Sequence, residues 1–418
     1  MKLVKMSLAA AVLLGASAFA VDNVKVSGDA KLFYGTDNKD QAAGISDSLF
    51  DQANSYADTA LRLGVTADLA KGISMGATAN AISTLGLENN LVANTWAAHQ
   101  NAVDDTAWMS ELWIAGTMGK TTLKVGRMEL DTPLAFSESW SVAKNTFDAA
   151  VVINQDLPDT TVVGAWVGKS NGADAVTAAP DVAERDLILR DGAKFTTFMK
   201  KGAYAAGLVN NSYKPATVQA WYYNIGLVAD AYWLQADINC DMVKGVKIGA
   251  QYGDIDVKNG GILGAAAEDS SAYAFKLAYQ GIEGLNLSAA YSKADDKGSV
   301  QIQNVAGSGQ SKLYTEAWWN YTYVGSKDAE AFNLTAEYDV KDIAKLGVYY
   351  TSVSNDIAAG VAGSTKEMDE VTVTASKSFG PLDATLAYIS TDADDQNLDA
   401  SNNGQRYDSV QAYLTLNF

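Results

Sequence analysis

Several residue types and patterns are scarce in this 418-residue sequence, and each scarcity narrows the class of protein. The single cysteine, Cys240, excludes an internal disulfide framework, and only five prolines beside 35 glycines suit sheet and turns better than helices. After residue 20, no apolar run reaches the roughly 20 residues that a membrane-spanning helix requires. Basic residues number 31 against 49 acidic ones, which argues against nucleic acid as a partner because phosphates need a basic surface.

The first 20 residues differ from the rest of the chain. Lys2 and Lys5 precede an apolar run over residues 8–14, and Ala18-Phe19-Ala20 has the small-x-small pattern of a cleavage site. This order is typical of a secretory signal peptide. We therefore predict a signal peptide at residues 1–20 and one domain at residues 21–418. Without the two lysines the formal charge changes from −18 to −20.

Apolar and polar residues alternate with a period of two in many later segments. The segment LNLSAAYS places Leu285, Leu287 and Tyr291 on one face, with Asn286 and Ser288 on the other. The same pattern occurs in AYAFKLAYQ, AFNLTAEYDV, LRLGVTADL, DATLAYIS and VQAYLTLNF. Such alternation predicts strands with one apolar and one polar face.

A soluble β-sandwich would also contain alternating strands, so further features have to distinguish the two architectures. The polar faces carry charges and glycines in nearly every segment. Aromatic residues mark the ends of the apolar faces at Tyr252, Tyr279, Tyr338, Tyr388 and Phe418. An outer-membrane barrel combines an apolar band toward lipid, aromatic girdles and a wet interior. We therefore predict an all-β transmembrane antiparallel barrel.

The lengths of the connections predict the number of strands. Eight short turns alternate with nine longer polar loops, and these seventeen connections join eighteen strands. An even number, with both termini at the short-turn end, is expected of a single-chain bacterial barrel. The count places 169–191 and 210–228 in long loops and Lys200–Gly202 in a short turn, so ATVQAWYYN (216–224) is loop. Sixteen strands is the alternative, because counting 216–224 as a strand breaks the parity unless another segment is lost.

The third long loop, near residues 128–145, is longer than an ordinary hairpin turn. Its sequence resembles the corresponding region of epsilonproteobacterial major outer-membrane porins and, more distantly, eighteen-stranded carboxylate and amino-acid channels of pseudomonads. The matching elements are Gly126-Arg127, Thr132-Pro133 and Thr146-Phe147. The final strand ends at Phe418, which resembles the signal read by the machinery that assembles outer-membrane barrels.

The resemblance implies an eighteen-stranded barrel, often trimeric, that passes small hydrophilic solutes and has its third loop folded inward. The partners that it implies are two further copies of the chain, outer-membrane lipid and lipopolysaccharide, and the assembly machinery. A barrel of this size leaves an aqueous lumen unless something folds into it. Charge and width at the narrowest place then set selectivity.

Charged residues near that place are the candidate site. The acidic side of the constriction is predicted to contain Glu129, Asp131 and Glu138. The basic side, on the pore wall, is predicted to contain Arg62, Lys124, Arg127 and Lys194.

Arg127 requires a special arrangement. Strict alternation puts it on the lipid face with Leu123 and Val125, where a cation at the bilayer midplane costs about 2–4 kcal/mol. We expect either a bulge near Gly126 or a strand that has already left the bilayer there, and either would let Arg127 turn inward.

The acidic composition motivates a preference for cations, because a narrow passage of low dielectric concentrates counter-ions. The loop Asp392–Asp399 is a candidate for binding Ca²⁺, which favours carboxylate oxygens, but it lacks the remainder of an EF-hand loop. No other cofactor or metal is expected.

Three alternatives stay open beside a general diffusion pore. One is a substrate-specific channel for small carboxylates or amino acids, and a second is a surface adhesin or structural barrel. An enzyme is the third, but His99 is the only histidine and no serine lies in a nucleophile-elbow pattern. We predict that the protein is not an enzyme.

Overall fold

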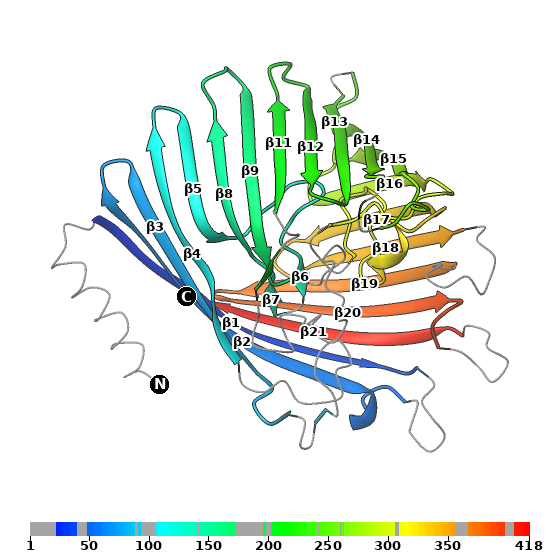
Figure 1. Ribbon diagram of the computed structural model, residues 1–418. Helices are drawn as coiled ribbons and strands as arrows, with labels where there is room; N and C mark the ends of the chain where they lie inside the picture. Colours follow the sequence, from blue (N-terminus) through cyan, green and yellow to red (C-terminus); the bar gives the residue numbers. More distant parts are fainter. Residues whose placement is uncertain are drawn as a thin grey trace, which may run out of the picture.

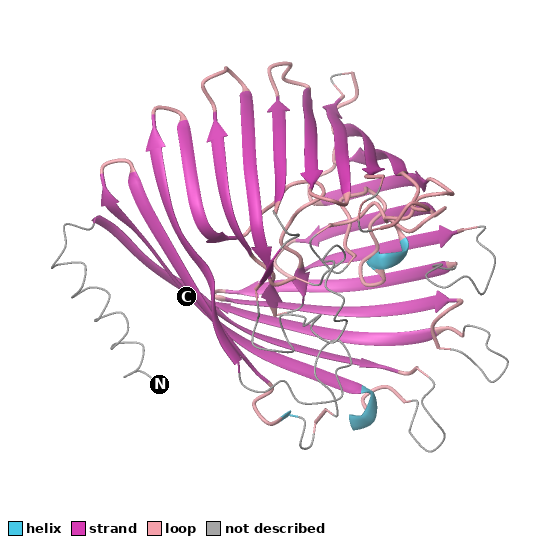
Figure 2. Cartoon of the chain, in the orientation of Figure 1, coloured by secondary structure: helices cyan, strands magenta, loops and turns pink. Residues whose placement is uncertain are grey.

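The computed structural model describes residues 22–39, 48–87, 91–92, 106–140, 142–172, 195–197, 202–240, 242–259, 261, 263–305, 309–355, 367–397 and 405–418. They form a closed antiparallel β-barrel, and the curved wall of strands encloses loops (Figures 1 and 2). The eighteen wall strands are β1 (Asp22–Asp37), β2 (Ser55–Ala70), β3 (Ile73–Ser83), β4 (Thr106–Met118), β5 (Thr121–Met128), β8 (Phe147–Asn154), β9 (Thr160–Ser170), β11 (Ala203–Asn210), β12 (Ala216–Ile225), β13 (Ala229–Asn239), β14 (Val246–Val257), β15 (Ser270–Tyr279), β16 (Leu285–Ala294), β17 (Glu330–Val340), β18 (Ala344–Ser354), β19 (Met368–Phe379), β20 (Leu382–Ala393) and β21 (Tyr407–Asn417).

A few short elements accompany the eighteen long strands. The two-residue strand β10 (Thr196–Thr197) pairs with the end of β9, and β6 (Ser139–Trp140) pairs with β7 (Ala143–Lys144) in a small hairpin. Single turns of 3₁₀ helix occur at η1 (Gln52–Asn54) and η5 (Tyr321–Tyr323). Among the described residues, no helix has the length and apolar character needed to cross a membrane.

The first and last strands close the barrel. β1 pairs with β2 on one side and with β21 on the other, from Asp29 opposite Asn417 to Asp37 opposite Ser409. The seam ends with two backbone hydrogen bonds, from Gly28 N to Phe418 O at 2.8 Å and from Phe418 N to Gly28 O at 2.9 Å. A Cβ atom at Gly28 would collide with the Phe418 ring, so a glycine is needed there. Closure leaves no strand edge to be satisfied by lipid.

The alternation seen in the sequence is realised on the two faces of the wall. On β17, Phe332 and Leu334 are exposed on the outside, whereas Ala331 and Asn333 are buried against the contents of the barrel. On β13, Trp233 points inward and is 0% exposed, while its neighbour Leu234 points outward and is 53% exposed. Apolar residues outside and a mixed interior are the arrangement of a membrane barrel, so the predicted architecture is confirmed.

The count of eighteen strands is confirmed and the alternative of sixteen is wrong, but two segments changed places. Residues 216–225, predicted as loop, form β12, which pairs with β11 and β13 throughout. Of the strand implied between residues 191 and 200, the structure describes only the two-residue β10, and β11 pairs directly with β9 from Ala203–Val167 to Asn210–Thr160. Gly202 therefore lies at the long-loop end of the barrel, and residues 211–215 make the short turn instead, with Asn211 N donating to Asp159 O at 2.9 Å.

Candidate functional site

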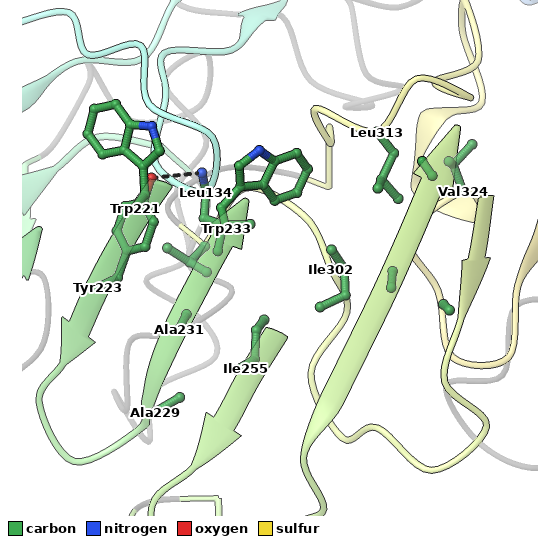
Figure 3. Packing of buried hydrophobic residues seen from close by; sticks show 14 of the residues in the cluster. Leu134, Trp221, Tyr223, Ala229, Ala231, Trp233, Ile255, Ile302, Leu313 and Val324 are labelled. Atoms are coloured by element: carbon green, nitrogen blue, oxygen red, sulfur yellow. Dashed lines mark hydrogen bonds between the residues drawn. The ribbon is translucent and has the colours of Figure 1, made fainter. Parts of the chain in front are cut away.

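The third loop, residues 129–146, leaves the end of β5 and crosses the interior of the barrel. A tight turn shapes its first part, where Thr132 N donates to Ala135 O at 3.1 Å and Ser137 N donates to Leu130 O at 2.8 Å. Leu134 at the turn is buried among side chains from β12 and β13, and its backbone N–H donates to the Tyr223 hydroxyl at 3.3 Å (Figure 3). The predicted inward fold of this loop is confirmed.

A second loop also folds into the barrel, which the sequence patterns did not reveal. We call residues 295–329, between β16 and β17, the aromatic loop, because it contains Tyr314, Trp318, Trp319, Tyr321 and Tyr323. Its apolar side chains Ile302, Val305, Leu313 and Val324 belong to the same buried cluster as Leu134 of the third loop (Figure 3). The barrel interior is therefore partly filled by two loops rather than narrowed by one.

The aromatic loop is fixed to opposite parts of the wall. On one side, the Tyr314 hydroxyl donates to Asp237 of β13 at 2.6 Å. On the other side, the Trp319 ring stacks on Phe33 of β1 with ring centroids 6.5 Å apart.

The carboxylate of Glu370 on β19 is a further anchor for the aromatic loop. It accepts hydrogen bonds from Trp319 N at 3.1 Å, Asn320 N at 2.8 Å and Asn320 Nδ2 at 2.9 Å. Glu370 is buried, and the described residues place no salt-bridge cation on it. Burying a carboxylate is costly unless its oxygens are hydrogen-bonded, and backbone donors of the loop meet that need.

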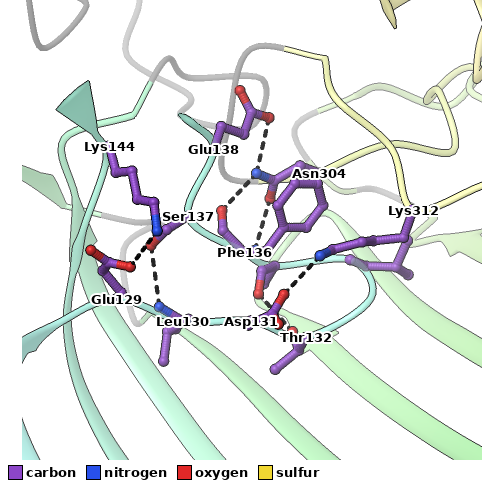
Figure 4. Close-up of polar contacts among 12 residues, drawn as sticks. Glu129, Leu130, Asp131, Thr132, Phe136, Ser137, Glu138, Lys144, Asn304 and Lys312 are labelled. Carbon is purple, nitrogen blue, oxygen red and sulfur yellow. Dashed lines mark hydrogen bonds and ion pairs between the residues drawn. The ribbon is translucent and has the colours of Figure 1, made fainter. Parts of the chain in front are cut away.

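The side chain of Asn304 in the aromatic loop forms hydrogen bonds with the third loop (Figure 4). Its side-chain oxygen accepts from Phe136 N at 3.2 Å, while its Nδ2 donates to Phe136 O at 2.8 Å and to Glu138 Oε1 at 3.0 Å. The backbone adds a bond from Val305 N to Leu134 O at 2.9 Å. One amide thus satisfies both polar groups of a backbone unit in the other loop, so the two loops pack as one body.

Two predicted acids, Glu129 and Asp131, do have access to water inside the barrel. The Asp131 side chain is 83% exposed, and its Oδ1 lies 2.7 Å from Lys312 Nζ of the aromatic loop (Figure 4). Lys312 also lies over the Phe136 ring, 4.6 Å from its centroid. The pair joins the two loops on their lumen side, where a passing ion can reach both charges.

A row of alternating charges connects the third loop to the wall. Arg62 of β2 lies 2.6 Å from Asp29 of β1 and 3.7 Å from Glu129 of the loop. Glu129 also pairs with Lys144 on the returning limb at 2.8 Å, and Lys31 lies 4.0 Å from Asp29. The predicted basic residue Arg62 is thus brought to the predicted acid Glu129. Three cations meet two carboxylates here.

Glu138 does not face the lumen, so its predicted place on the acidic side of the pore is wrong. The residue is 0% exposed, because the small hairpin of the third loop and Asn304 enclose it. Its backbone N–H donates to Asn145 Oδ1 at 2.6 Å. The side chain therefore helps to fix the loop against its neighbour.

A third carboxyl, that of the partly buried Glu316, lies in the aromatic loop itself. It accepts from Ser311 N at 3.1 Å and also contacts the Ser311 hydroxyl. Removal from water, with Glu138 and Glu370 nearby as further negative charges, raises the pKa of Glu316 to about 8. The aromatic loop is therefore packed with this carboxyl in its neutral form at neutral pH.

Arg127 lies on the outer face of the wall, so its predicted place on the pore wall is wrong. The ladder runs without a shift through β5, and Arg127 stands opposite Leu112 and Asp148 on the same face as Val125. The guanidinium is 2.8 Å from Asp148 and lies over the Phe195 ring at 3.3 Å. Because Arg127 is one residue from the end of β5, this pair sits at the rim rather than at the bilayer midplane, which removes the need for an inward turn.

The remaining predicted residues have mixed outcomes. Lys124 stands opposite the buried Ala115 and Val151, so it points inward, and its ammonium lies 4.2 Å from the Trp113 ring centroid. Lys194 and His99 lie outside the described residues. No group of three or more His, Cys, Asp or Glu side chains in the described part of the chain could hold a metal ion, and part of the loop 392–399 lies outside that part.

The residues that the sequence patterns missed fall into two groups. Asp29, Lys31 and Lys144 belong to the row of charges around Arg62 and Glu129, and the others belong to the aromatic loop or contact it. This second group consists of Asn304, Lys312, Glu316 and Glu370. One signal was available for the aromatic loop, namely the aromatic-rich stretch LYTEAWWNYTYV at residues 313–324. So many large apolar rings are costly to leave in water, which indicates burial of the connection that contains them.

Comparison with known proteins agrees with this geometry. A model of the family described as Campylobacter major outer membrane protein matches residues 1–411. The chain belongs to this family. The resemblance found in the third loop is thereby confirmed for the whole chain, and the outer membrane is the location of the family.

Solved structures resemble this member of the major outer membrane protein family over nearly its whole length. Acinetobacter baumannii OccAB3 has a TM-score of 0.72 at 12% identity, covering 95% of this chain and 99% of that one. Pseudomonas aeruginosa OccK8 (OprE) has a TM-score of 0.70 at 16% identity, covering 95% and 98%. P. aeruginosa OccK1 (OpdK) has a TM-score of 0.70 at 16% identity, covering 94% and 98%. No curated protein sequence matches this chain. At these identities the likeness shows the shared fold.

Proposed function

We propose that this family member is a porin, a water-filled channel through which ions and small hydrophilic solutes diffuse passively across the outer membrane. The observation that carries the proposal is a closed lipid-facing barrel with charged side chains exposed inside it, at Arg62, Glu129 and Asp131. The third loop and the aromatic loop narrow the passage, so the size of the solutes that pass is limited by the space that these two loops leave open inside the barrel. The family and the fold are those of a channel rather than an enzyme.

Liposome swelling tests the channel directly. Vesicles that contain the purified protein should swell in isotonic solutions of small sugars and resist swelling as sugar size increases. A surface adhesin or structural barrel would leave the vesicles unchanged. Electrical silence of the protein in planar bilayers would contradict the proposal.

We also propose that the channel prefers cations. Glu129 is flanked by Arg62 and Lys144, so its charge is largely balanced, whereas Asp131 is mostly exposed beside one partly exposed lysine. Exposed ion pairs contribute only ~0–1 kcal/mol, so Asp131 stays accessible to passing cations. Reversal potentials across a salt gradient measure the preference, and anion selectivity would refute it.

A substrate-specific channel for small carboxylates or amino acids is the second candidate. One of the similar solved structures is P. aeruginosa OpdK with vanillate, a carboxylate. In this chain, Lys31, Arg62 and Lys144 gather near the constriction and exceed the two carboxylates among them. A conductance that is blocked in a saturable way by one carboxylate would favour this candidate over general diffusion.

We also propose how the protein is exported and how it assembles. Export through the signal peptide at residues 1–20 predicts a mature chain that begins at Val21, which N-terminal sequencing of the membrane protein would show. A homotrimer predicts a particle of three chains in light scattering. Contacts with lipopolysaccharide and recognition of the final strand by the assembly machinery stay predictions.

A further inference from the structure

Aromatic side chains mark most of the outer face of the wall but are missing from one side of it. Each wall strand from β9 to β20 has at least one aromatic side chain on its outer face. Examples around the barrel are Trp166 on β9, Tyr232 on β13, Phe332 on β17 and Tyr388 on β20, which are 39–43% exposed. Aromatic girdles of this kind are typical of the places where a barrel meets the interface between membrane and water.

Five neighbouring strands, β2, β3, β4, β5 and β8, have no aromatic side chain on the outer face (Figure 1). The aromatic residues that these strands contain all point inward, and they are Tyr56, Trp108, Trp113 and Phe147. Phe147 is fully buried, and the other three pack against buried clusters inside the barrel. We call the outer face of these five strands the non-aromatic face. It lacks the side chains that mark contact with lipid head groups elsewhere on the wall.

The non-aromatic face also differs from the rest of the outer surface in charge. Its outward side chains include one acid, Asp148, and this carboxylate is paired with Arg127 at 2.8 Å. The other side of the barrel carries several outward carboxylates beside tyrosines, as where the Tyr252 hydroxyl donates to Asp254 at 2.8 Å. Copies of a chain with a formal charge of −18 repel one another least where such acids are absent or balanced.

The wall strands are short at this side of the barrel. β5 and β8 contain eight residues each, as does β11 two strands further on. A tilted strand needs about 9–11 residues to cross the hydrocarbon of a bilayer. Lipid against eight-residue strands would therefore meet part of the connections as well, whereas a neighbouring copy of the chain imposes no such length.

The relief of the non-aromatic face offers two complementary parts. On β3, Ala77 and Ala79 stand between larger apolar side chains of β2 and β4, so a groove runs along β3. Two strands away, Leu123 and Val125 of β5 are 50% and 49% exposed and form a ridge. One copy can place its ridge in the groove of the next copy. Such a heterologous contact produces a closed ring when the rotation between copies closes.

We propose that the non-aromatic face is the surface through which copies of this chain associate, with the β5 ridge of one copy against the β3 groove of the next. The inference rests on the homotrimer proposed above and adds where its subunits meet. Lipid then surrounds the strands from β9 to β20, where the aromatic side chains and the outward carboxylates lie.

The first test compares two outward side chains that are about equally exposed in a single chain. Ile114 on the non-aromatic face is 57% exposed, and Leu234 on β13 is 53% exposed. Ile114→Cys and Leu234→Cys are made separately in the full-length protein with Cys240→Ser, labelled with a nitroxide and reconstituted in phosphatidylcholine vesicles. Because the proposed contact excludes lipid, oxygen dissolved in the hydrocarbon should reach the label at position 114 several-fold less than the label at position 234.

The second test uses a groove variant and a matched control. Ala79→Leu fills the groove on β3 and should reduce the particle measured by light scattering in detergent from three chains to one. Ala220→Leu makes the same change between Leu208 of β11 and Leu234 of β13, on the side that carries aromatic residues, and should leave three chains. Circular dichroism checks that both variants keep their strands.

The possible contradictions are distinct. Equal access of oxygen to the two labels in a three-chain particle would overturn the position of the interface and leave the trimer standing. A single-chain particle for the unaltered protein would refute the trimer and the interface together. Loss of the trimer in Ala220→Leu but not in Ala79→Leu would assign the contact to the other side of the barrel. Swelling and conductance can be normal in each case, so the porin proposal is tested separately.

Discussion

The two loops inside the barrel differ in how they are held and in what they present to the lumen. The third loop is polar on its lumen side, where Glu129 and Asp131 meet cations from the wall and from the other loop. The aromatic loop is held by buried rings, by Asn304 and by backbone donors that end on Glu370. One loop thus supplies charge, and the other supplies the support that keeps that charge in place.

This difference implies a division of effects among substitutions. Changes in the third loop should alter which ions pass, because its side chains are exposed to them. Changes at Glu370 or Asn304, which anchor the aromatic loop, should alter the width of the passage, because the loop would no longer be held in one position inside the barrel. The following predictions test that division, beginning with the largest expected effect.

Removing the anchor on β19 should have the largest effect. Glu370→Ala leaves Trp319 N and Asn320 N without their acceptor and should weaken the packing of the loop by about 3 kcal/mol or more, since hydrogen bonds to charged groups contribute ~1.5–3 kcal/mol each. We expect a higher single-channel conductance and faster proteolysis within residues 295–329.

A wall carboxylate that touches a neighbouring strand provides the control for this prediction. Glu111→Ala removes an inward residue on β4 that accepts from Thr78 Oγ1 at 3.3 Å. It should leave proteolysis of the aromatic loop unchanged. If Glu370→Ala behaved like Glu111→Ala, the anchoring role would be wrong.

Removing the hydrogen bonds that Asn304 makes to the third loop should have the next largest effect. Asn304→Ala removes three hydrogen bonds to the third loop and leaves Phe136 N and O unpaired, at a cost of about 1–3 kcal/mol for buried polar groups. Because the loops would no longer move as one body, we expect larger fluctuations in open-channel current. Asn286→Ala removes an amide that donates to Glu337 on the wall at 2.9 Å. This control variant should leave the fluctuations in open-channel current unchanged.

The neutral Glu316 carboxyl makes the packing of the aromatic loop depend on pH. Its pKa in the packed loop is raised to about 8 from an ordinary value of 4.5, so the packed state holds the proton more tightly than a released loop does. The stabilisation is complete below pH 4.5, decreases as pH rises toward about 8, and is then lost. Conductance should therefore increase between pH 5 and pH 8.

A substitution without a titrating group isolates this effect. Glu316→Gln keeps the shape and a neutral side chain, so its conductance should change less over the same range. Glu138 and Glu370, the charged groups that face Glu316, remain in this variant. A pH response identical to that of the unaltered protein would assign the effect to other groups.

The smallest effect is expected at the exposed pair between the loops. Lys312→Ala frees Asp131 and should raise the cation-to-anion permeability ratio by at most about five-fold, because exposed pairs contribute ~0.2–1 kcal/mol. Asp131→Asn should lower the ratio, and neither change should alter proteolysis of the loops. Lys214→Ala breaks a pair with Asp159 at the short-turn end, 2.7 Å apart, and should leave the ratio unchanged.

Much of the wall could be predicted from alternation, because membrane and lumen impose opposite preferences on successive residues. The error at β12 has a physical cause. Residues 226–228 make a very short turn at the end of the barrel where long loops were expected, so the strand before this turn was predicted to be part of one long loop over residues 210–228. The prediction also contained an additional strand before Gly202, and this error cancelled the omission of β12 in the number of strands. A correct number of strands therefore did not require each strand to be correct.

The interior was less predictable, because its contacts join residues far apart in the chain. Asn304 and Phe136 are separated by 168 positions, and no periodicity relates an amide in one loop to the backbone of another. The position of Arg127 was uncertain for a different reason, since alternation gave the correct face but not the distance from the bilayer midplane. Its ion pair with Asp148 at the rim makes the outward position acceptable.

The burial of the aromatic loop also affects how the protein can vary. A long connection ordinarily runs over the surface of a protein and tolerates changes of sequence. Ile302, Leu313, Tyr323 and Val324 are enclosed instead, so a replacement there is tested by fit inside the barrel rather than by exposure outside it. Replacements at these four positions are therefore limited by packing, as they are in the core of a soluble domain.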